Sequence, residues 1–327
     1  MTAPPAGGPG GTEIPRLLSA QFRAASITEF AYLTPRGEPL CWPVTPYWYP
    51  DRCILGISTG LGYPNKAHYA RRHPRVAALF GSTLLQGDAV VLDDDLQANT
   101  DRYIREMRAK FLSARFGLNP VSVKLLDFYL PRLWIEISPV RVVAGAVGAG
   151  GPAGAGGAAD GSPVQNLRSA KKNDQTSPSP PALAPSSQLD ALLRWVRRAT
   201  SAVVALAGPD GYPAIARVGV ADGPDGTVEL ESAPGTGPAA LTFHTQGLGG
   251  VRLDALMARG RVEASDGLVR FVPRRVVGFL GREPDTRPSF LSIFPLSQFP
   301  RAGAFRERLR FELIRRGEAP PLLRVPR

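Results

Sequence analysis

The chain has little cysteine and no long apolar run. Its 327 residues include two cysteines, Cys41 and Cys53, which are too few for a disulfide framework or a cysteine-based zinc site. No window approaches the roughly 18 uncharged apolar residues of a membrane span, and residues 1–11 lack the basic start and apolar stretch of a signal peptide. We therefore expect a cytoplasmic protein with reduced cysteines, no membrane partner and no metal site.

The charge is strongly positive but is spread along the chain. Lys and Arg number 39 against 28 Asp and Glu, which gives a net charge of +11. Such an excess admits nucleic acid, an acidic membrane or an anionic cofactor as partner. A composition rich in arginine, proline and alanine is also what a GC-rich genome produces. We therefore do not expect nucleic acid to be the partner.

Residues 30–64 recur in the second half of the chain at an offset of 174 positions, without a gap. Several of the shared residues form turns, and the apolar positions between them also coincide. Two copies of one structural unit are the economical interpretation. The identical positions are Ala31, Pro35, Gly37, Pro39, Val44, Pro50, Asp51, Ser58 and Pro64.

The two copies differ where a phosphate could bind. Ser58 of the first copy corresponds to Ser232 of the second, but Thr59 and Lys66 are replaced by Ala233 and Ala240. A strand that ends in Ser58-Thr59, turns on glycines and delivers a lysine at a helix start can hold a phosphate, because free N–H groups, hydroxyls and a cation converge there. We predict an anion site in the first copy alone.

The first unit, residues 15–143, should form a small barrel. Apolar periodicity and turn residues predict six strands with helices inserted between them. The expected strands are residues 29–33, 39–48, 53–58, 76–80, 84–92 and 133–143, and the expected helices are 15–25, 66–72 and 99–116.

A linker and a second unit follow. Residues 144–187 consist largely of Gly, Ala, Ser and Pro and cannot bury enough apolar surface to order themselves, so we predict a flexible linker. Residues 188–327 should form a second, degenerate barrel with a basic C-terminal helix. Its expected helices are 189–198 and 301–316, and its expected strands are 202–207, 213–220, 227–231, 261–264, 268–272 and 276–279.

Two features concern the hairpin near residues 50–51. Cys41 should lie opposite about residue 60 rather than Cys53, so we expect no disulfide between them. An aromatic-rich stretch on one strand comprises Trp42, Tyr47, Trp48 and Tyr49, and alternate side chains there face opposite sides. One face should be core, and the other could line a cofactor or a dimer contact.

The order of motifs in residues 28–143 resembles the FMN-binding split-barrel superfamily, which includes pyridoxamine-phosphate oxidases and flavin/deazaflavin oxidoreductases. That superfamily has a Gly-x-Pro hairpin, a strand ending in Ser/Thr, a basic turn with lysine, and a Pro-Arg-Val segment leading into the next strand. The resemblance covers about a third of the chain. The matching segments are Gly37-Glu-Pro39, Pro43-Val44-Thr45-Pro46-Tyr47-Trp48, Ser58-Thr59, Lys66, His73-Pro74-Arg75-Val76 and Leu85-Gln86-Gly87.

The resemblance implies a phosphate site made by Ser58, Thr59 and Lys66. Many members place an arginine directly before the lysine, and here that position is Asn65, so the site is less basic than usual. The C-terminal arginine and histidine signature that holds pyridoxamine phosphate is not recognisable, and we do not predict that substrate.

The resemblance also implies an isoalloxazine site. Backbone of Thr45, Pro46 and Tyr47 and the side chain of Gln86 would lie near the ring. If Gln86 is buried on its strand, its amide needs partners, so flavin contact and internal hydrogen bonding both remain open. No catalytic residue can be assigned.

The leading hypothesis is a mainly β protein with peripheral helices, built as two tandem split barrels. It would be an oxidoreductase that transfers hydride through FMN to a small molecule, with NAD(P)H as a possible donor. The flavin would lie between two barrels, within one chain as a pseudo-dimer or between chains of a homodimer. The alternatives are deazaflavin or haem as the ligand, a non-enzymatic binder of any of these, and a basic nucleic-acid module.

Overall fold

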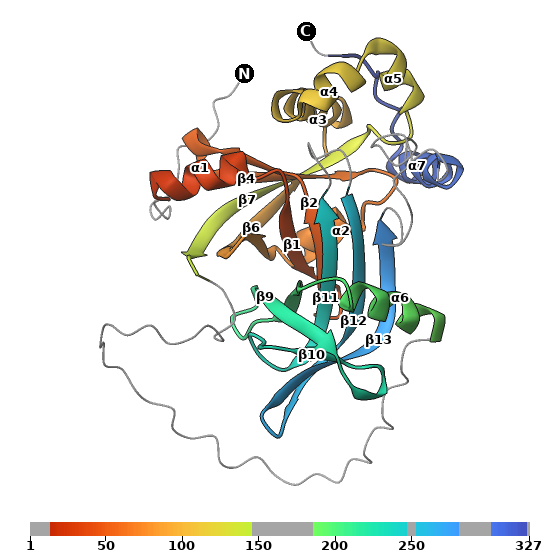
Figure 1. Cartoon of the computed structure of the whole chain (residues 1–327). Coiled ribbons are helices and arrows are strands. Elements are labelled where there is room, and N and C mark those ends of the chain that lie inside the picture. Colours follow the sequence, from red (N-terminus) through yellow and green to blue (C-terminus); the bar gives the residue numbers. More distant parts are fainter. Residues whose placement is uncertain (1–13, 146–185, 247–252, 281–301, 326–327) are drawn as a thin grey trace.

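The computed structural model describes residues 14–145, 186–246, 253–280 and 302–325. The strands form two sheets, one open with seven strands and one closed into a barrel of six, and the fold is mainly β (Figure 1). The predicted linker, residues 144–187, lies almost entirely outside the described residues. No helix within the described ranges is long and apolar enough to cross a membrane.

The open sheet comes from the first half of the chain. Its strands run in the order β2-β1-β5-β6-β7-β4-β3, and all neighbours are antiparallel. Its elements are α1 (Arg16–Ala24), β1 (Thr28–Leu33), β2 (Pro39–Val44), β3 (Pro46–Tyr49), η1 (Pro50–Arg52), β4 (Ile54–Gly60), α2 (Asn65–Arg72), β5 (Arg75–Phe80), β6 (Thr83–Leu92), α3 (Leu96–Lys110), α4 (Leu112–Gly117), α5 (Pro120–Leu125) and β7 (Arg132–Val143).

The single strand predicted over residues 39–48 is divided at Thr45. Its first half, β2, pairs with β1, whereas its second half, β3, pairs with β4. Pro46 begins β3 and has no N–H to donate to a ladder, which suits the change of partner. The sheet therefore has seven strands rather than six. Cys41 lies opposite Ala31 of β1, so its expected position near residue 60 was wrong, but both cysteines are free as predicted.

The closed barrel comes from the second half. Its strands follow the order β10-β13-β12-β11-β8-β9, and β9 closes the ring against β10. The elements are α6 (Ser186–Val196), β8 (Ser201–Ala207), β9 (Pro213–Asp222), η2 (Pro224–Gly226), β10 (Val228–Leu230), β11 (Gly237–Gln246), β12 (Leu253–Ser265), β13 (Leu268–Leu280) and α7 (Ala302–Arg316).

The two sheets share one succession of strand pairs. The series β2-β1-β5-β6-β7-β4 in the first corresponds to β9-β8-β11-β12-β13-β10 in the second. The ungapped alignment nevertheless fails after Ser232. Pro64 precedes helix α2, whereas Pro238 lies inside β11, so no helix stands between β10 and β11. The second copy therefore lacks the helix that carries Lys66 in the first.

The sheets pack directly on each other. Strands β1, β2, β5 and β6 contact β8, β9, β11 and β12, and each contact has a counterpart when the two sheets are exchanged. All six side chains of β1 are buried, because one face lines the first core and the other faces the barrel. The core of the first sheet continues into Val203, Ala205 and Met257 of the barrel.

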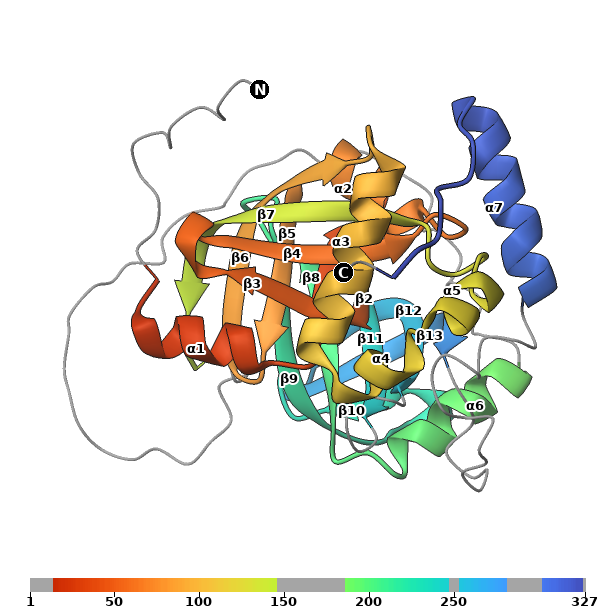
Figure 2. The same cartoon turned by 90° about the horizontal axis from the view of Figure 1, so that it is seen from above.

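Helices cover the remaining faces of the open sheet. Helix α1 lies on β3, with Phe22 packed against Trp48 and Phe80. Helices α3, α4 and α5 pack over β3 and β7, where they form a second core with Tyr47 and Trp134 (Figure 2). The predicted helix 99–116 is interrupted at Phe111, which has extended backbone angles, and α5 was not predicted.

Helix α7 follows the barrel in sequence but returns to the open sheet. Leu309 and Leu313 join the core of that sheet, and Phe305 packs against Tyr63 and Phe128. Figure 1 shows α7 beside α5, at the end of the open sheet that carries α2. The helix itself agrees with the predicted range 301–316.

Candidate functional site

The hydroxyls of Ser58 and Thr59 point to opposite sides of the open sheet. In β4, Leu55 and Ile57 belong to the sheet's core, and Thr59 continues that face by the two-residue period of a strand. The Thr59 hydroxyl donates to the carbonyl oxygen of Tyr63 at 3.2 Å and closes the turn. Ser58 lies on the other face, which α3 to α5 cover, so the two predicted ligands do not converge.

Lys66 occupies the first turn of α2, as predicted. It makes no ion pair or hydrogen bond with any residue in the described part of the chain. Burial, together with the positive charge of Arg132, lowers its pKa to about 8. An uncompensated lysine near a second cation is a place where a bound anion is favourable.

Arg132 is the neighbouring cation, and the sequence analysis missed it. It opens β7 opposite Gly60, and a Cβ on Gly60 would lie 3.2 Å from Arg132 Nη1. Its Cζ lies 4.1 Å from the ring centroid of Tyr103 and 4.0 Å from that of Tyr129. The residue is 5% exposed, and its Nε and Nη2 have no hydrogen-bond partner among the described residues.

Further polar groups without partners lie on the same face. Tyr47 and Trp134 pack with ring centroids 5.2 Å apart, and the Tyr47 hydroxyl and Trp134 Nε1 are buried without a partner in the described residues. Gly56 makes room for the indole, since a Cβ there would lie 2.9 Å from Trp134 Nε1. These unpaired groups can all donate, which fits an oxyanion better than a cation.

The predicted segment Thr45 to Tyr47 adjoins this face. Thr45 is half-buried at the break between β2 and β3, and the carbonyl oxygen of Pro46 accepts a hydrogen bond of 2.6 Å from Lys110 Nζ. Burial lowers the pKa of Lys110 to about 8, and Glu106 partly offsets this effect. The Pro46 carbonyl is therefore engaged within the chain.

Gln86 lies apart from these residues, at the contact between the two sheets. Its Nε2 donates to the carbonyl oxygen of Pro213 at 2.9 Å, and its Oε1 accepts from Arg141 Nε at 2.7 Å. Of the two alternatives left open for Gln86, the structure shows internal hydrogen bonding. Its amide joins the open sheet to the barrel.

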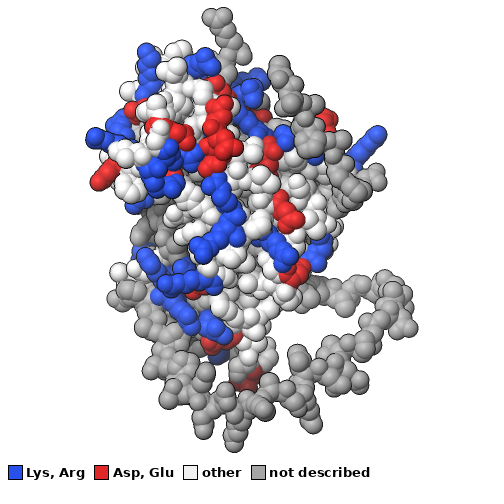
Figure 3. Space-filling view, turned by 180° about the vertical axis from the view of Figure 1, so that it is seen from behind, with Lys and Arg blue, Asp and Glu red and all other residues white. Residues whose placement is uncertain are grey.

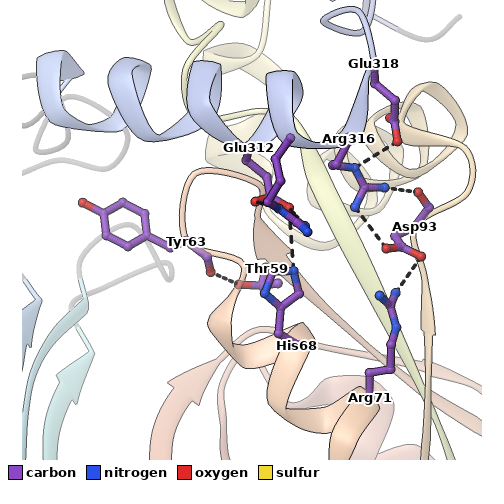
Figure 4. A network of polar contacts seen from close by, with 9 residues as sticks. Thr59, Tyr63, His68, Arg71, Asp93, Glu312, Arg316 and Glu318 are labelled. Atoms are coloured by element: carbon purple, nitrogen blue, oxygen red, sulfur yellow. Dashed lines mark hydrogen bonds and ion pairs between the residues drawn. The ribbon is translucent and has the colours of Figure 1, made fainter.

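Helix α7 covers the turn between β4 and α2. A Cβ on Gly62 would lie 3.2 Å from the carbonyl oxygen of Phe305, and Arg308 stacks on Tyr63. An ion pair between Arg316 and Asp93 holds the helix, and Glu312 lies 3.7 Å from His68 of α2, whose pKa burial lowers, so that contact is ionic only when His68 is protonated (Figure 4). Helix α7 therefore restricts access to this turn from its own side.

A buried ionic cluster lies between the sheets. Glu29 of β1 accepts hydrogen bonds from Arg217 of β9 and from His244 Nε2 of β11, the latter at 2.6 Å. Burial alone would raise the pKa of Glu29, but His244 and Arg217 outweigh it and hold the pKa below its ordinary value. The cluster joins the two halves of the chain, because Glu29 and Arg217 are 188 residues apart in sequence.

Basic side chains are not gathered into one band on the face shown in Figure 3. They are spread over that face, with acidic side chains among them in its upper part. Many arginines of the described residues are paired, for example Arg52 and Arg102 with Glu136. This distribution does not favour a nucleic-acid groove there.

No family model matches the chain, and no curated protein matches it. Among solved structures, a conserved hypothetical protein from Mycobacterium tuberculosis matches with a TM-score of 0.31 and 13% identity, over 42% of this chain and 88% of the other. An F420 reductase matches with a TM-score of 0.30 and 14% identity, over 40% and 98%. A putative pyridoxamine 5'-phosphate oxidase from Lactobacillus delbrueckii gives 0.28 and 14%, over 40% and 93%. Scores this low assign neither family nor activity.

Proposed function

We propose that the chain binds a flavin-type cofactor, FMN in the first instance, through its phosphate at the segment from β4 to α2. One observation carries the proposal: Lys66 stands unpaired among the described residues at the start of α2, with a pKa of about 8. An oxyanion would supply the missing counter-charge. Of the predicted phosphate-site residues, Lys66 is the one free to hold it, because Thr59 is bonded to Tyr63 and Ser58 faces α3 to α5 rather than the side on which α2 packs.

The reaction class that follows is an oxidoreductase acting on a small molecule, with NAD(P)H as a candidate donor. A flavin or deazaflavin supplies hydride transfer when bound, and the chain positions it and shields it from water. Each contact between the two sheets has a counterpart when the sheets are exchanged, and this symmetry supports an intrachain pseudo-dimer. In such a pseudo-dimer the barrel forms the side of the cofactor site that a second subunit would otherwise form.

The first test is the absorbance spectrum of the purified chain with added FMN. We expect bound flavin in the native chain, and an affinity about tenfold lower in Lys66→Met, since a charge-assisted hydrogen bond is lost. Lys124→Met is the matched control, because Lys124 is exposed on α5. A native chain that neither contains FMN when purified nor binds added FMN would overturn the choice of FMN as the cofactor. Deazaflavin and then haem would next be tested in the same way.

The affinity for FMN should also depend on pH. Lys66 is charged below its pKa of about 8 and neutral above it, so binding should weaken as the pH rises from 7 to 9. Fluorescence titration at several pH values measures this change. Lys66→Met should show no such dependence, and a dependence that persists in this variant would point to Lys110 instead.

The covering helix α7 favours one alternative, a carrier that binds the cofactor without turnover. Phe305 and Arg308 lie on the turn that a substrate would have to pass. Stopped-flow mixing of the flavin-loaded chain with NADH or NADPH separates the two functions. Bleaching of the flavin band supports the oxidoreductase, and a stable oxidised spectrum under both donors supports the carrier.

A further inference from the structure

Arg132 presents a hydrogen-bonding edge that no described residue uses. Nε and Nη2 lie on the same edge of a guanidinium, and this edge grips carboxylates elsewhere in the chain. Arg315 donates through it to Glu312 at 2.9 and 2.5 Å, and Arg306 donates through it to Asp127. In Arg132 both groups are buried and have no partner in the described part of the chain.

Leaving this edge empty is costly. A buried donor without a partner loses its hydration, and the penalty is larger for a charged group. The rings of Tyr103 and Tyr129 stack on Arg132 and hold it in place, but they leave the edge unsatisfied. Lining residues that fix an arginine while its edge has no protein acceptor are typical of a site for a planar or tetrahedral oxyanion.

The surroundings of Arg132 provide further donors. Ser58 and Arg132 lie on the same face of adjacent strands, because Gly60 is opposite Arg132 and Ser58 is two residues away. Such diagonal neighbours are about 7–8 Å apart, a distance that one phosphate group can bridge. Ser58 and Gly60 are only half-buried, so this strip of the sheet is reached by solvent.

The charge favours a dianion over a monoanion. Lys66 feels the charge of Arg132, and neither has a carboxylate partner among the described residues. Two uncompensated cations that feel each other's charge suit a phosphate monoester, which carries close to two negative charges at neutral pH. A phosphodiester or a carboxylate brings only one.

We propose that Arg132, through its Nε–Nη2 edge, binds a phosphate monoester group together with Ser58, and that it supplies the positive charge that Asn65 does not. This inference deepens the proposed function and rests on it only for the identity of the molecule that carries the phosphate. It also assigns a preference: a cofactor with a terminal phosphate binds more tightly than its dephosphorylated form.

The test is calorimetric titration with inorganic phosphate and, separately, with FMN and riboflavin. The native chain should bind phosphate, and Arg132→Lys should weaken it about 10- to 100-fold, since a lysine keeps the charge but loses the two-point contact. Ser58→Ala should weaken it by a smaller factor. Arg105→Lys, an exposed position on α3, is the matched control and should bind as the native chain does.

A measurement on the native chain guards against a variant that does not fold. The Nε–H resonance of Arg132 in a ¹⁵N-labelled sample should shift when phosphate is added. Phosphate binding that neither moves this resonance nor weakens in Ser58→Ala would overturn the inference. So would no phosphate binding at millimolar concentration.

The same titrations separate this inference from the proposed function. If phosphate binds through Arg132 but FMN gains nothing over riboflavin, the anion site stands and the flavin proposal fails. If FMN binds and Arg132→Lys leaves the preference for FMN over riboflavin unchanged, the flavin proposal stands and the role of Arg132 fails.

Discussion

Glu29→Gln should lower the free energy of unfolding by about 2–3 kcal/mol. Breaking a buried ion pair by removing one partner costs about 3–5 kcal/mol, because the remaining charge stays uncompensated. The expected loss is smaller here, since the side chain of Arg217 is 35% exposed and keeps part of its hydration. Urea unfolding followed by circular dichroism measures the change.

The matched control is Glu38→Gln. Glu38 pairs with Arg259, also across the two sheets, but both side chains are about a third exposed. An exposed pair contributes about 0–1 kcal/mol, so this variant should unfold nearly as the native chain does. If both variants lose the same free energy of unfolding, burial of Glu29 does not determine how much its ion pair stabilises the fold.

The Glu29 cluster also fixes the direction of an acid effect. The pKa of Glu29 is lower in the folded chain than its ordinary value, so the folded state binds fewer protons there than the unfolded state. Its contribution to stability is complete above the unfolded pKa, near 4, and is lost as the pH falls through the folded pKa. Glu29→Gln should flatten the decline of stability below about pH 4 relative to the native chain.

Residues that begin and end helices made part of the site predictable from sequence. Pro64 and His73-Pro74 bound the helix that carries Lys66, and α2 spans residues 65–72, one residue more than the predicted 66–72. The two-residue period of a strand is enough to predict from sequence that Ser58 and Thr59 lie on opposite faces of the sheet, because consecutive side chains in a strand face opposite sides. The prediction grouped them because both stand at the end of one strand before a glycine turn, and it did not apply this period.

The rest depended on partners far away in the chain. Gln86 is satisfied by a carbonyl 127 residues later, and no local pattern specifies that bond. The predicted strand 39–48 is divided at Thr45 because β2 pairs with β1 and β3 pairs with β4. The apolar sequence continues across this point and gives no sign of the change of partner. Strand β11 was missed because its first residues, Gly237 and Pro238, look like a turn. Arg132 directly precedes Leu133 and Trp134, and a charge at the first residue of a buried apolar strand was the available signal.

Gly260→Ala should lower the free energy of unfolding by about 3 kcal/mol or more, an overpacking penalty at its upper end. A Cβ at Gly260 would lie 2.1 Å from the carbonyl oxygen of Val272, and backbone cannot yield as a side chain can. The glycine adjoins an irregularity between β12 and β13. Gly87 holds the corresponding place, next to the shift between β6 and β7, with a Cβ only 2.4 Å from the carbonyl oxygen of Ser138.

If the two sheets are built alike, Gly87→Ala should destabilise the chain by a similar amount. Gly235→Ala is the control, because Gly235 is exposed and its Cβ would meet nothing closer than 4.0 Å. The midpoint of urea unfolding should fall in both bulge variants and stay constant in the control. A normal midpoint for Gly260→Ala would show that β12 and β13 can separate there, and the close strand approach would then not be what shapes the barrel.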